Sequence, residues 1–236
     1  GIVTRSGGLV PSNDYLAACV DYLLQHRPDW SGSLQVGKTV VTSGMVDRVT
    51  RSREREVYEV PVGFKWFVDG LVDGSLGFVG EESAGSTLLR RDGTPWTTDK
   101  DGIAATLLSA EMTARTGKDP SELYAGLADR FGRPEYRRLS APATAEQKRR
   151  LKSLDAADIE LSQVGGEPIE SVLTHAAGNG AAIGGLKVTT ANAWFAVRPS
   201  GTEDIYKIYA ESFIGGDHVD GVAGEVEEIV KGLLGS

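Results

Sequence analysis

The sequence predicts an α/β three-layer domain with a mixed, mostly parallel sheet, followed by a smaller α+β domain with an antiparallel sheet. Two observations support this prediction. Up to residue 131, short β-branched or apolar runs alternate with helical periodicities, which is typical of parallel strands covered by helices on both faces. Beyond residue 134 the order changes to several extended runs closed by an amphipathic helix, which indicates antiparallel strands with a helix at the end.

Composition and charge narrow the class of protein. The 236 residues suffice for one large domain or two ordinary ones, and 40% hydrophobic with 25% charged residues is typical of a globular chain. The net charge of −8, without a block of basic residues, argues against a nucleic-acid partner. No apolar run reaches the about 18 residues of a membrane span, and no signal segment opens the chain. The single Cys19 excludes a disulfide framework and predicts a cytoplasmic protein.

The beginning of the chain is expected to be a remnant of another domain. Gly1 is not Met, which indicates a piece of something longer, and residues 1–5 form a short apolar strand with no evident partner nearby. We therefore assign residues 1–12 to a leftover strand and linker, residues 13–132 to the α/β domain and residues 133–236 to the α+β domain. Charge does not mark these boundaries.

The elements of the α/β domain follow from apolar spacing. Ser12 is placed as the N-cap of a helix whose apolar residues recur at helical spacing up to Leu24. A β-branched run predicts a buried strand over 39–42, and further strands are expected over 57–60 and 76–79. Helices are expected over 43–52, 63–71, 99–116 and 120–131.

The helix over 99–116 carries apolar residues that we expect to face the core, including Ile103, Leu107 and Leu108. Gly117 ends it, and Pro120 begins the next helix.

The α+β domain is predicted from a second set of patterns. Residues 136–139 are extended and 144–154 form a charged surface helix. Strands are expected over 171–174, 186–190, 194–197 and 205–213, the middle two joined as a hairpin, with a closing amphipathic helix over 219–234.

The turn Arg198-Pro199-Ser200-Gly201-Thr202-Glu203 has the residue types of a phosphate-binding turn. Arginine offers a planar fork that matches phosphate oxygens, and hydroxyls with glycine-freed amides complete the cradle. Lys207 on the following strand could add a second cation. A plain hairpin turn with Arg198 in a surface ion pair fits the same residues.

The turn Gly80-Glu81-Glu82-Ser83-Ala84-Gly85 follows a predicted parallel strand, where ligands of open α/β sheets collect. Two carboxylates and a hydroxyl suit a polyhydroxyl ligand, because sugar hydroxyls need interleaved donors and acceptors. A metal site and an acidic surface turn are the alternatives.

Two lysines are further candidates. Lys100 lies at the expected start of a helix, where a cation is unfavourable unless an anion is bound at that end. Pairing with Asp99 or Asp101 is the simpler explanation. Lys65 lies between Phe64 and Trp66.

Together these segments are similar to the α-D-phosphohexomutases, and most closely to the bacterial phosphoglucomutases. The resemblance covers nearly the whole chain, and the order and separation of its four motifs are specific. The motifs are residues 60–70 (VPVGFKWFVDG), 80–85 (GEESAG), 92–96 with 99–102 (DGTPW and DKDG), and 198–203 with 205–209 (RPSGTE and IYKIY).

The resemblance implies roles for these residues. Family members have four domains around a cleft, of which the third binds sugar hydroxyls and the fourth binds the substrate phosphate. Glu81 and Ser83 match positions that hydrogen-bond the O3 and O4 hydroxyls, and Lys100 matches a lysine that reaches into the cleft. Gly63 and Lys65 match positions on the hinge side of the sugar site. The positions of the phosphate loop are matched by Arg198, Ser200, Gly201 and Thr202, with Lys207 as a further cation.

The resemblance also implies what this sequence lacks. No serine has the sequence setting of the family's phosphorylated nucleophile, and the aspartate-rich Mg²⁺ loop, which in relatives comes immediately before a segment like 1–4, is absent. We therefore expect the third and fourth domains of an enzyme that interconverts glucose 1-phosphate and glucose 6-phosphate through a phosphoserine and glucose 1,6-bisphosphate. Mg²⁺ and glucose 1,6-bisphosphate would serve the intact enzyme. This chain alone is expected to bind neither, to hold no catalytic residue or metal ligand, and to be inactive.

The expected partners are a hexose phosphate, bound by the acidic turn and the arginine turn together, and the two missing N-terminal domains of the same polypeptide. A fragment of a phosphomannomutase or phosphoglucosamine mutase is one alternative. A stand-alone sugar-phosphate-binding protein is another, against which the non-Met start and the unpaired first strand argue. The coding sequence upstream of Gly1 would discriminate between these hypotheses.

Overall fold

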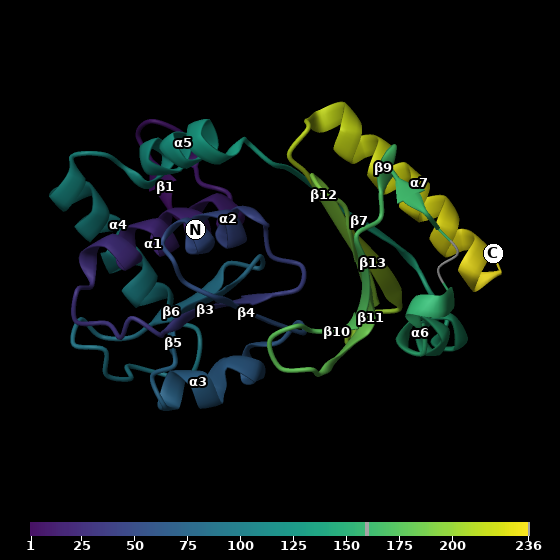
Figure 1. Ribbon diagram of the computed structural model, residues 1–236, viewed down its shortest axis with the longest axis horizontal. Coiled ribbons are helices and arrows are strands. Elements are labelled where there is room, and N and C mark those ends of the chain that lie inside the picture. The colour runs from purple at the N-terminus through teal and green to yellow at the C-terminus, as the bar shows by residue number, and fades with distance from the viewer. Residues whose placement is uncertain (159–160, 236) are drawn as a thin grey trace. The chain divides into compact units, whose positions relative to one another are not determined.

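The chain forms two compact units, each with its own sheet. The computed structural model describes residues 1–158 and 161–235 (Figure 1). The first unit comprises residues 1–132 with 177–179, and the second comprises the described residues of 133–176 and 180–235.

The first unit is built on a mixed sheet. Its described strands are β3 (Gln35–Thr39), β4 (Val57–Val60), β5 (Leu76–Glu81) and β6 (Gly85–Leu88), in the order β4-β3-β5-β6. β3 runs parallel to both β4 and β5, and β6 alone is antiparallel to its neighbour. The predicted mostly parallel sheet is confirmed, with β6 as a strand that the sequence did not indicate.

Helices cover both faces of this sheet. In Figure 1, α1 and α2 lie over one face and α3 lies under the other. The helices of the unit are α1 (Ser12–His26), α2 (Met45–Ser52), the 3₁₀ helix η1 (Phe64–Phe67), α3 (Val68–Val72), α4 (Gly102–Thr116) and α5 (Pro120–Phe131). The α5 bounds are those predicted, because Asp119 and Glu122 form a capping box before Pro120 and Gly132 follows the last turn.

The buried strand predicted over 39–42 lies earlier in the chain, at Gln35–Thr39. The prediction was wrong because the strand contains Lys38, which is only 2% exposed. Its ammonium forms ion pairs with Asp47 and Glu59, and these pairs make burial of the charge tolerable. A lysine in a sequence gives no sign that such partners exist.

The first strand is not unpaired, which corrects a second prediction. β1 (Val3–Thr4) pairs antiparallel with β2 (Gly8–Leu9) through a short turn. The Ser6 hydroxyl donates to Asp119 Oδ1 at 2.7 Å, so the turn is fastened to the start of α5. Arg5, Ser6 and Gly7 connect the two strands, and Gly8 has a positive φ of 68°, which glycine adopts without strain and which lets the chain fold back.

The second unit is an antiparallel sheet, as predicted. Its strands lie in the order β10-β11-β12-β13-β7 within the described residues. Their bounds are β7 (Glu135–Pro142), β10 (Ser171–His175), β11 (Ala182–Thr189), β12 (Ala193–Pro199) and β13 (Ile205–Ser212), with the small hairpin β8 (Gln163–Val164) and β9 (Glu167–Pro168). The other elements are α6 (Ala145–Lys152), the 3₁₀ turn η2 (Ala156–Asp158) and α7 (Gly216–Leu234).

The core of the second unit lies between the sheet and α7. Buried valines along α7, such as Val222 and Val226, belong to one cluster with Phe195 and Val197 of β12. Because side chains alternate along a strand, Arg198 lies on the opposite sheet face, away from this core. Lys207 is paired with Arg198 in the ladder and therefore shares its face.

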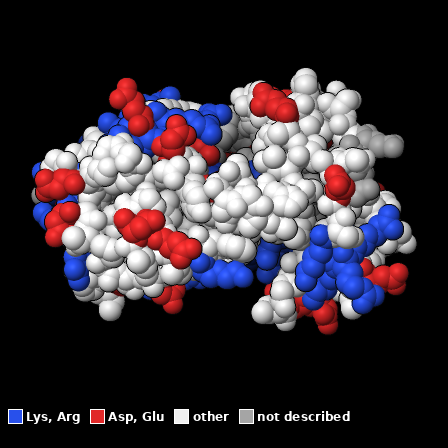
Figure 2. Space-filling model, turned by 60° about the horizontal axis from the view of Figure 1, so that its bottom comes forward, with Lys and Arg blue, Asp and Glu red and all other residues white. Residues whose placement is uncertain are grey.

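Charge on the surface is mixed, with one gathering of cations. Figure 2 shows lysine and arginine side chains together in the region of α6, whose last turn carries Arg149, Arg150 and Lys152. Cations at a helix C-terminus are favourable because they oppose the negative end of the helix dipole. Among the helices described, none has the length and apolar character needed to cross a bilayer.

Candidate functional site

The acidic turn is the hairpin loop between β5 and β6. Glu81 is the last residue of β5 and only 4% of it is exposed, so its carboxylate lies inside the turn. Ala84 closes the turn with a φ of +73°, and its N–H donates to the Glu81 carbonyl at 3.0 Å. A buried carboxylate needs charged or hydrogen-bonding partners, and these come from the turn itself and from one other segment.

Lys100 and Ser83 both contact one oxygen of Glu81. Lys100 Nζ lies 2.5 Å from Oε1, and the Ser83 hydroxyl donates to the same atom at 2.9 Å. Among the described residues nothing donates to the other oxygen, Oε2. The structure thus brings together three of the predicted sugar-site residues and leaves one carboxylate oxygen as an acceptor.

The pairing of Lys100 excludes the simpler explanation offered for it. Its ammonium pairs with Glu81, whereas Asp101 caps α4 by accepting from the Ile103 and Ala104 N–H groups, each at 2.9 Å. These backbone bonds, with a side-chain hydrogen bond from Trp96 Nε1, lower the pKa of Asp101. The helix begins at Gly102 rather than at 99, so Lys100 precedes it and lies outside its first turn.

Lys100 reaches Glu81 by crossing β6 at Gly85. A Cβ on Gly85 would lie 2.7 Å from Cδ and Cε of Lys100, so a side chain there would displace the lysine. Lys100 Nζ also lies 5.6 Å from the centre of the Phe64 ring, which brings the segment of Gly63 and Lys65 beside it. Gly63 has a φ of 134°, a conformation that favours glycine.

Lys65 is exposed, with Nζ 4.6 Å from the centre of the Trp66 ring. The structure thus places Lys65 near the acidic turn without a contact to Glu81.

Ser12 has a different role from the one predicted. Pro11 occupies the N-cap position of α1 and no side chain caps the helix. The Ser12 hydroxyl instead donates to the Glu82 carbonyl at 2.5 Å, so it fastens the acidic turn to the start of α1. This contact spans two segments far apart in the sequence, and no local pattern indicates it.

The arginine turn joins β12 and β13 in the second unit. Arg198 pairs with Lys207 across the two strands, and the Ser200 N–H donates to the Ile205 carbonyl at 2.9 Å. Gly201 and Thr202 are exposed at the tip. In the described part of the chain the Arg198 guanidinium forms no side-chain hydrogen bond or ion pair, so the surface ion pair offered as an alternative is absent there.

Two further charged residues take part in the arginine turn, Glu203 from the turn itself and Lys148 from α6. Glu203 Oε2 accepts from Lys207 Nζ at 3.1 Å, and the hydrogen bond and charge of that ammonium lower the pKa of Glu203. Lys148 of α6 donates to the Glu203 carbonyl at 2.7 Å. Glu203 belongs to the turn that the sequence indicated, whereas nothing in the sequence linked Lys148 to this turn.

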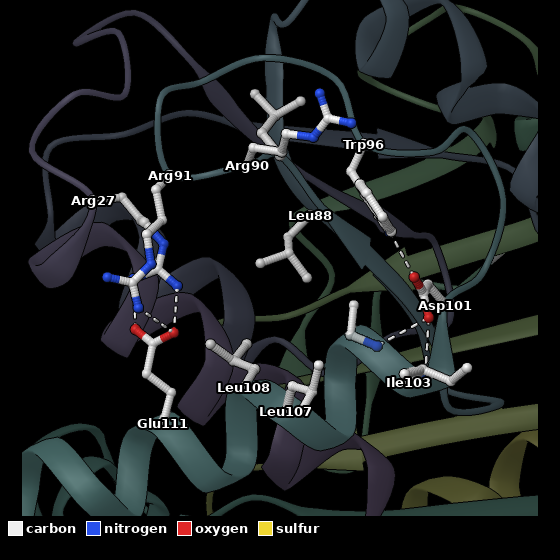
Figure 3. A pocket seen from close by; sticks show the side chains of 12 residues that line it. Arg27, Leu88, Arg90, Arg91, Trp96, Asp101, Ile103, Leu107, Leu108 and Glu111 are labelled. Atoms are coloured by element: carbon white, nitrogen blue, oxygen red, sulfur yellow. Dashed lines mark hydrogen bonds and ion pairs between the residues drawn. The ribbon is translucent and has the colours of Figure 1, made fainter.

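A separate groove in the first unit has a volume of 420 Å³ (Figure 3). Its floor is apolar, with Leu88, Leu107 and Leu108, and its charged side chains hold one another. Arg27 and Arg91 both pair with Glu111, and Arg90 stacks on Trp96 at 5.1 Å. Because these charges are already partnered, we do not place the candidate site here.

The structure also bears on the metal site that the sequence left open for the acidic turn. Across residues 1–158 and 161–235, no three His, Cys, Asp or Glu side chains are grouped so that they could hold a metal ion. The acidic turn therefore does not fit the metal site considered as an alternative, since Lys100 occupies the position beside its buried carboxylate.

The two units define a chain with an α/β domain followed by an α+β domain. The two candidate binding segments, the acidic turn and the arginine turn, are both turns between antiparallel strands. Residues 11–131 match the family model of the phosphoglucomutase/phosphomannomutase alpha/beta/alpha domain III, and residues 145–229 match that of the phosphoglucomutase/phosphomannomutase C-terminal domain. The chain belongs to the phosphoglucomutase/phosphomannomutase family.

Individual relatives agree with this assignment. The chain is 54% identical over 234 residues to a phosphoglucomutase of Komagataeibacter xylinus, covering 99% of the chain and 42% of that protein. It is 32% identical over 120 residues to the chloroplastic phosphoglucomutase of Solanum tuberosum, covering 50% of the chain and 18% of that protein. The chain thus spans less than half the length of these relatives.

The fold is shared with solved structures. A putative phosphomannomutase from Thermus thermophilus superposes with a TM-score of 0.71 at 22% identity, covering 98% of this chain and 43% of that one. The phosphoglucomutase parafusin of Paramecium gives a TM-score of 0.68 at 21% identity, covering 99% of this chain and 42% of that one. At these identities the likeness supports the fold.

Proposed function

We propose that the chain supplies the sugar-binding and phosphate-binding domains of a phosphoglucomutase, which interconverts glucose 1-phosphate and glucose 6-phosphate. The observation that carries this proposal is the 54% identity to the Komagataeibacter xylinus phosphoglucomutase along 99% of the chain. Phosphoryl transfer needs a nucleophile and a group that neutralises developing charge, in addition to binding. The proposal places the phosphoserine and the Mg²⁺ site on upstream domains of the same polypeptide, so that this chain alone has no mutase activity.

In this proposal the acidic turn reads the sugar. Glu81 Oε2 is the acceptor for a sugar hydroxyl, and Lys100 and Ser83 hold the carboxylate in place through Oε1. Glucose 1-phosphate and glucose 6-phosphate present their hydroxyls in opposite senses to a fixed site. A carboxylate beside an ammonium and a hydroxyl can satisfy both senses, because donors and acceptors lie side by side.

The arginine turn holds the phosphate that is not reacting. Arg198 offers a guanidinium with no side-chain partner among the described residues, next to Lys207 on the neighbouring strand. Ser200, Gly201 and Thr202 add hydroxyl and backbone donors at the tip. Anchoring the remote phosphate would orient the reacting end, which uses binding energy for positioning. Glucose 1,6-bisphosphate would use the same two turns in the intact enzyme.

The phosphate assignment is tested by titrating the 236-residue chain with glucose 6-phosphate while following backbone amide shifts. Arg198→Ala should weaken binding about 10- to 100-fold, since a charge-assisted contact contributes about 1.5–3 kcal/mol. Arg150→Ala, an exposed arginine of α6, removes the same charge from the same unit and serves as the control. Equal losses for both variants, or shifts confined to regions away from 198–207, would contradict the assignment.

The sugar assignment has its own test. Glu81→Gln should weaken binding of glucose 6-phosphate but leave binding of inorganic phosphate unchanged, because inorganic phosphate has no sugar for the acidic turn to contact. The same loss for both ligands would argue against a sugar-reading role. Repeating the titration with mannose 6-phosphate and glucosamine 6-phosphate would rank the affinities for the three hexose phosphates.

A cytoplasmic location of the protein stays a prediction that rests on the single cysteine.

A further inference from the structure

The carboxylate of Glu203 occupies the place where the arginine turn would receive an anion. Glu203 Oε2 accepts from Lys207 Nζ at 3.1 Å and from the Ser200 hydroxyl at 3.3 Å. Both donors are groups to which the proposed function assigns phosphate binding. The turn's own carboxylate takes up their hydrogen bonds.

The surroundings of this carboxylate are those of an anion site. Lys207 contacts it, Arg138 of the adjacent strand β7 contributes further positive charge, and Arg198 is the ladder partner of Lys207. The hydrogen bond from Lys207, with the charges of Lys207 and Arg138, favours the ionised form of Glu203 and lowers its pKa. The site therefore has an anion in it, and that anion is a residue of the turn.

We propose that Glu203 is an internal competitor for the phosphate site, so that a phosphate must displace its carboxylate before Ser200 and Lys207 can bind. This inference rests on the proposed function of the arginine turn. A serine hydroxyl has one proton to donate, and Ser200 gives that proton to Glu203. The hydroxyl cannot donate to Glu203 and to a phosphate at the same time.

Displacement is inexpensive because the Glu203 side chain lies at the surface. It is 56% exposed, so its carboxylate can rotate into water after losing the ion pair with Lys207. Exposed pairs of this kind contribute little to stability. The backbone carbonyl of Glu203 stays bound to Lys148, so the turn need not change its path when the side chain leaves.

The experiment compares two charge-matched variants of the full 236-residue chain. Glu203→Gln removes the competing charge, and Asp204→Asn removes the neighbouring carboxylate, which pairs with Lys148 instead. Each is titrated with inorganic phosphate at pH 7 and fixed ionic strength, with the amide shifts of 199–207 as the readout. Glu203→Gln should bind phosphate about two- to fivefold more tightly than the unaltered chain, and Asp204→Asn should not.

Each outcome decides the proposal. Weaker or unchanged binding of phosphate by Glu203→Gln would overturn the proposal. If Glu203 only positioned Lys207, its replacement would weaken phosphate binding rather than strengthen it. Equal tightening by both variants would also overturn it, because a general charge effect would explain the result.

Arg198→Ala in the same titration tests the site itself. If that variant still binds phosphate, the proposed function fails. If it loses binding while Glu203→Gln is unchanged, only the competitor role fails. Matching amide spectra outside the turn show that the variants are folded.

Discussion

Lys38 is a charged residue in the middle of a buried strand, and its partners decide the consequence of replacing it. Its ammonium pairs with Asp47 and Glu59 and donates to the Thr42 carbonyl at 3.3 Å. Lys38→Met should lower the free energy of unfolding by about 3–5 kcal/mol, because it takes the buried cation away from the carboxylates of Asp47 and Glu59. Urea unfolding measures this loss. Lys118→Met, at an exposed position, is the control and should change stability little.

A second set of variants checks the cause. Adding Asp47→Asn and Glu59→Gln to Lys38→Met removes the stranded charges and should recover part of the lost stability. No recovery would mean that Lys38 stabilises the strand through its packing rather than its charge.

Glu111 makes stability depend on pH. Burial by itself raises the pKa of Glu111, but hydrogen bonds from Arg27 and Tyr22 with the charges of Arg27 and Arg91 outweigh it and lower the pKa to about 2. Figure 3 shows Arg27 and Arg91 beside this carboxylate. A carboxyl with a lowered folded-state pKa contributes stability above its unfolded pKa and loses it as the pH falls toward the folded value. We expect a loss of up to about 3 kcal/mol between pH 5 and pH 2 from this residue.

The measurement is the free energy of unfolding across that pH range for the unaltered chain and Glu111→Gln. The variant should lack this part of the acid sensitivity, whereas Glu56→Gln, at an exposed site, should retain it. Parallel pH curves for all three proteins would contradict the assignment.

At the scale of single elements, α4 shows how tertiary context decides the outcome of a periodic pattern. The sequence placed Ile103, Leu107 and Leu108 on an inward face, but Ile103 is 77% and Leu107 is 66% exposed. Leu108 and Met112 are the residues of α4 that are buried. The adjacent pair Leu107 and Leu108 therefore differ in burial although the sequence treats them alike.

This difference gives a matched prediction within one helix. Leu108→Ala should reduce the free energy of unfolding by about 2–5 kcal/mol, because it removes buried methyl groups and leaves a cavity. Leu107→Ala should change it by less than about 0.5 kcal/mol, since Leu107 faces the open groove of Figure 3. Chemical unfolding of both variants gives the comparison. Similar losses would mean that Leu107 is covered by something in solution.

What the sequence could predict at this scale depends on whether the information is local. The bounds of α5 were predictable because Asp119, Pro120 and Gly132 are capping residues next to the helix. The bounds of β3 were not, because Gly37 lies against Phe67 and Val79 and Lys38 has distant acidic partners. The motifs of the candidate site were visible, but the partners of those motifs were not. Ser12 on the acidic turn and Lys148 on the arginine turn come from remote segments.

At the scale of the whole molecule, the second unit has a core made entirely of its own residues. The buried cluster between its sheet and α7 runs from Ala143 to Val230 and includes no residue of the first unit. A unit with its own core is expected to fold on its own. We therefore expect residues 133–236, expressed alone, to unfold in one cooperative transition by calorimetry, with equal van't Hoff and calorimetric enthalpies.

A core variant makes that expectation specific. Val226 is fully buried in α7, and Val226→Ala should cost about 2 kcal/mol and lower the melting temperature of the segment by roughly 10 °C. The exposed Glu228→Gln on the same helix should leave it nearly unchanged. If the segment shows no cooperative transition, or if Val226→Ala has no effect on it, the packing of α7 against this sheet depends on the rest of the protein. If the segment does unfold cooperatively, it should also bind inorganic phosphate, because every residue of the arginine turn lies within it.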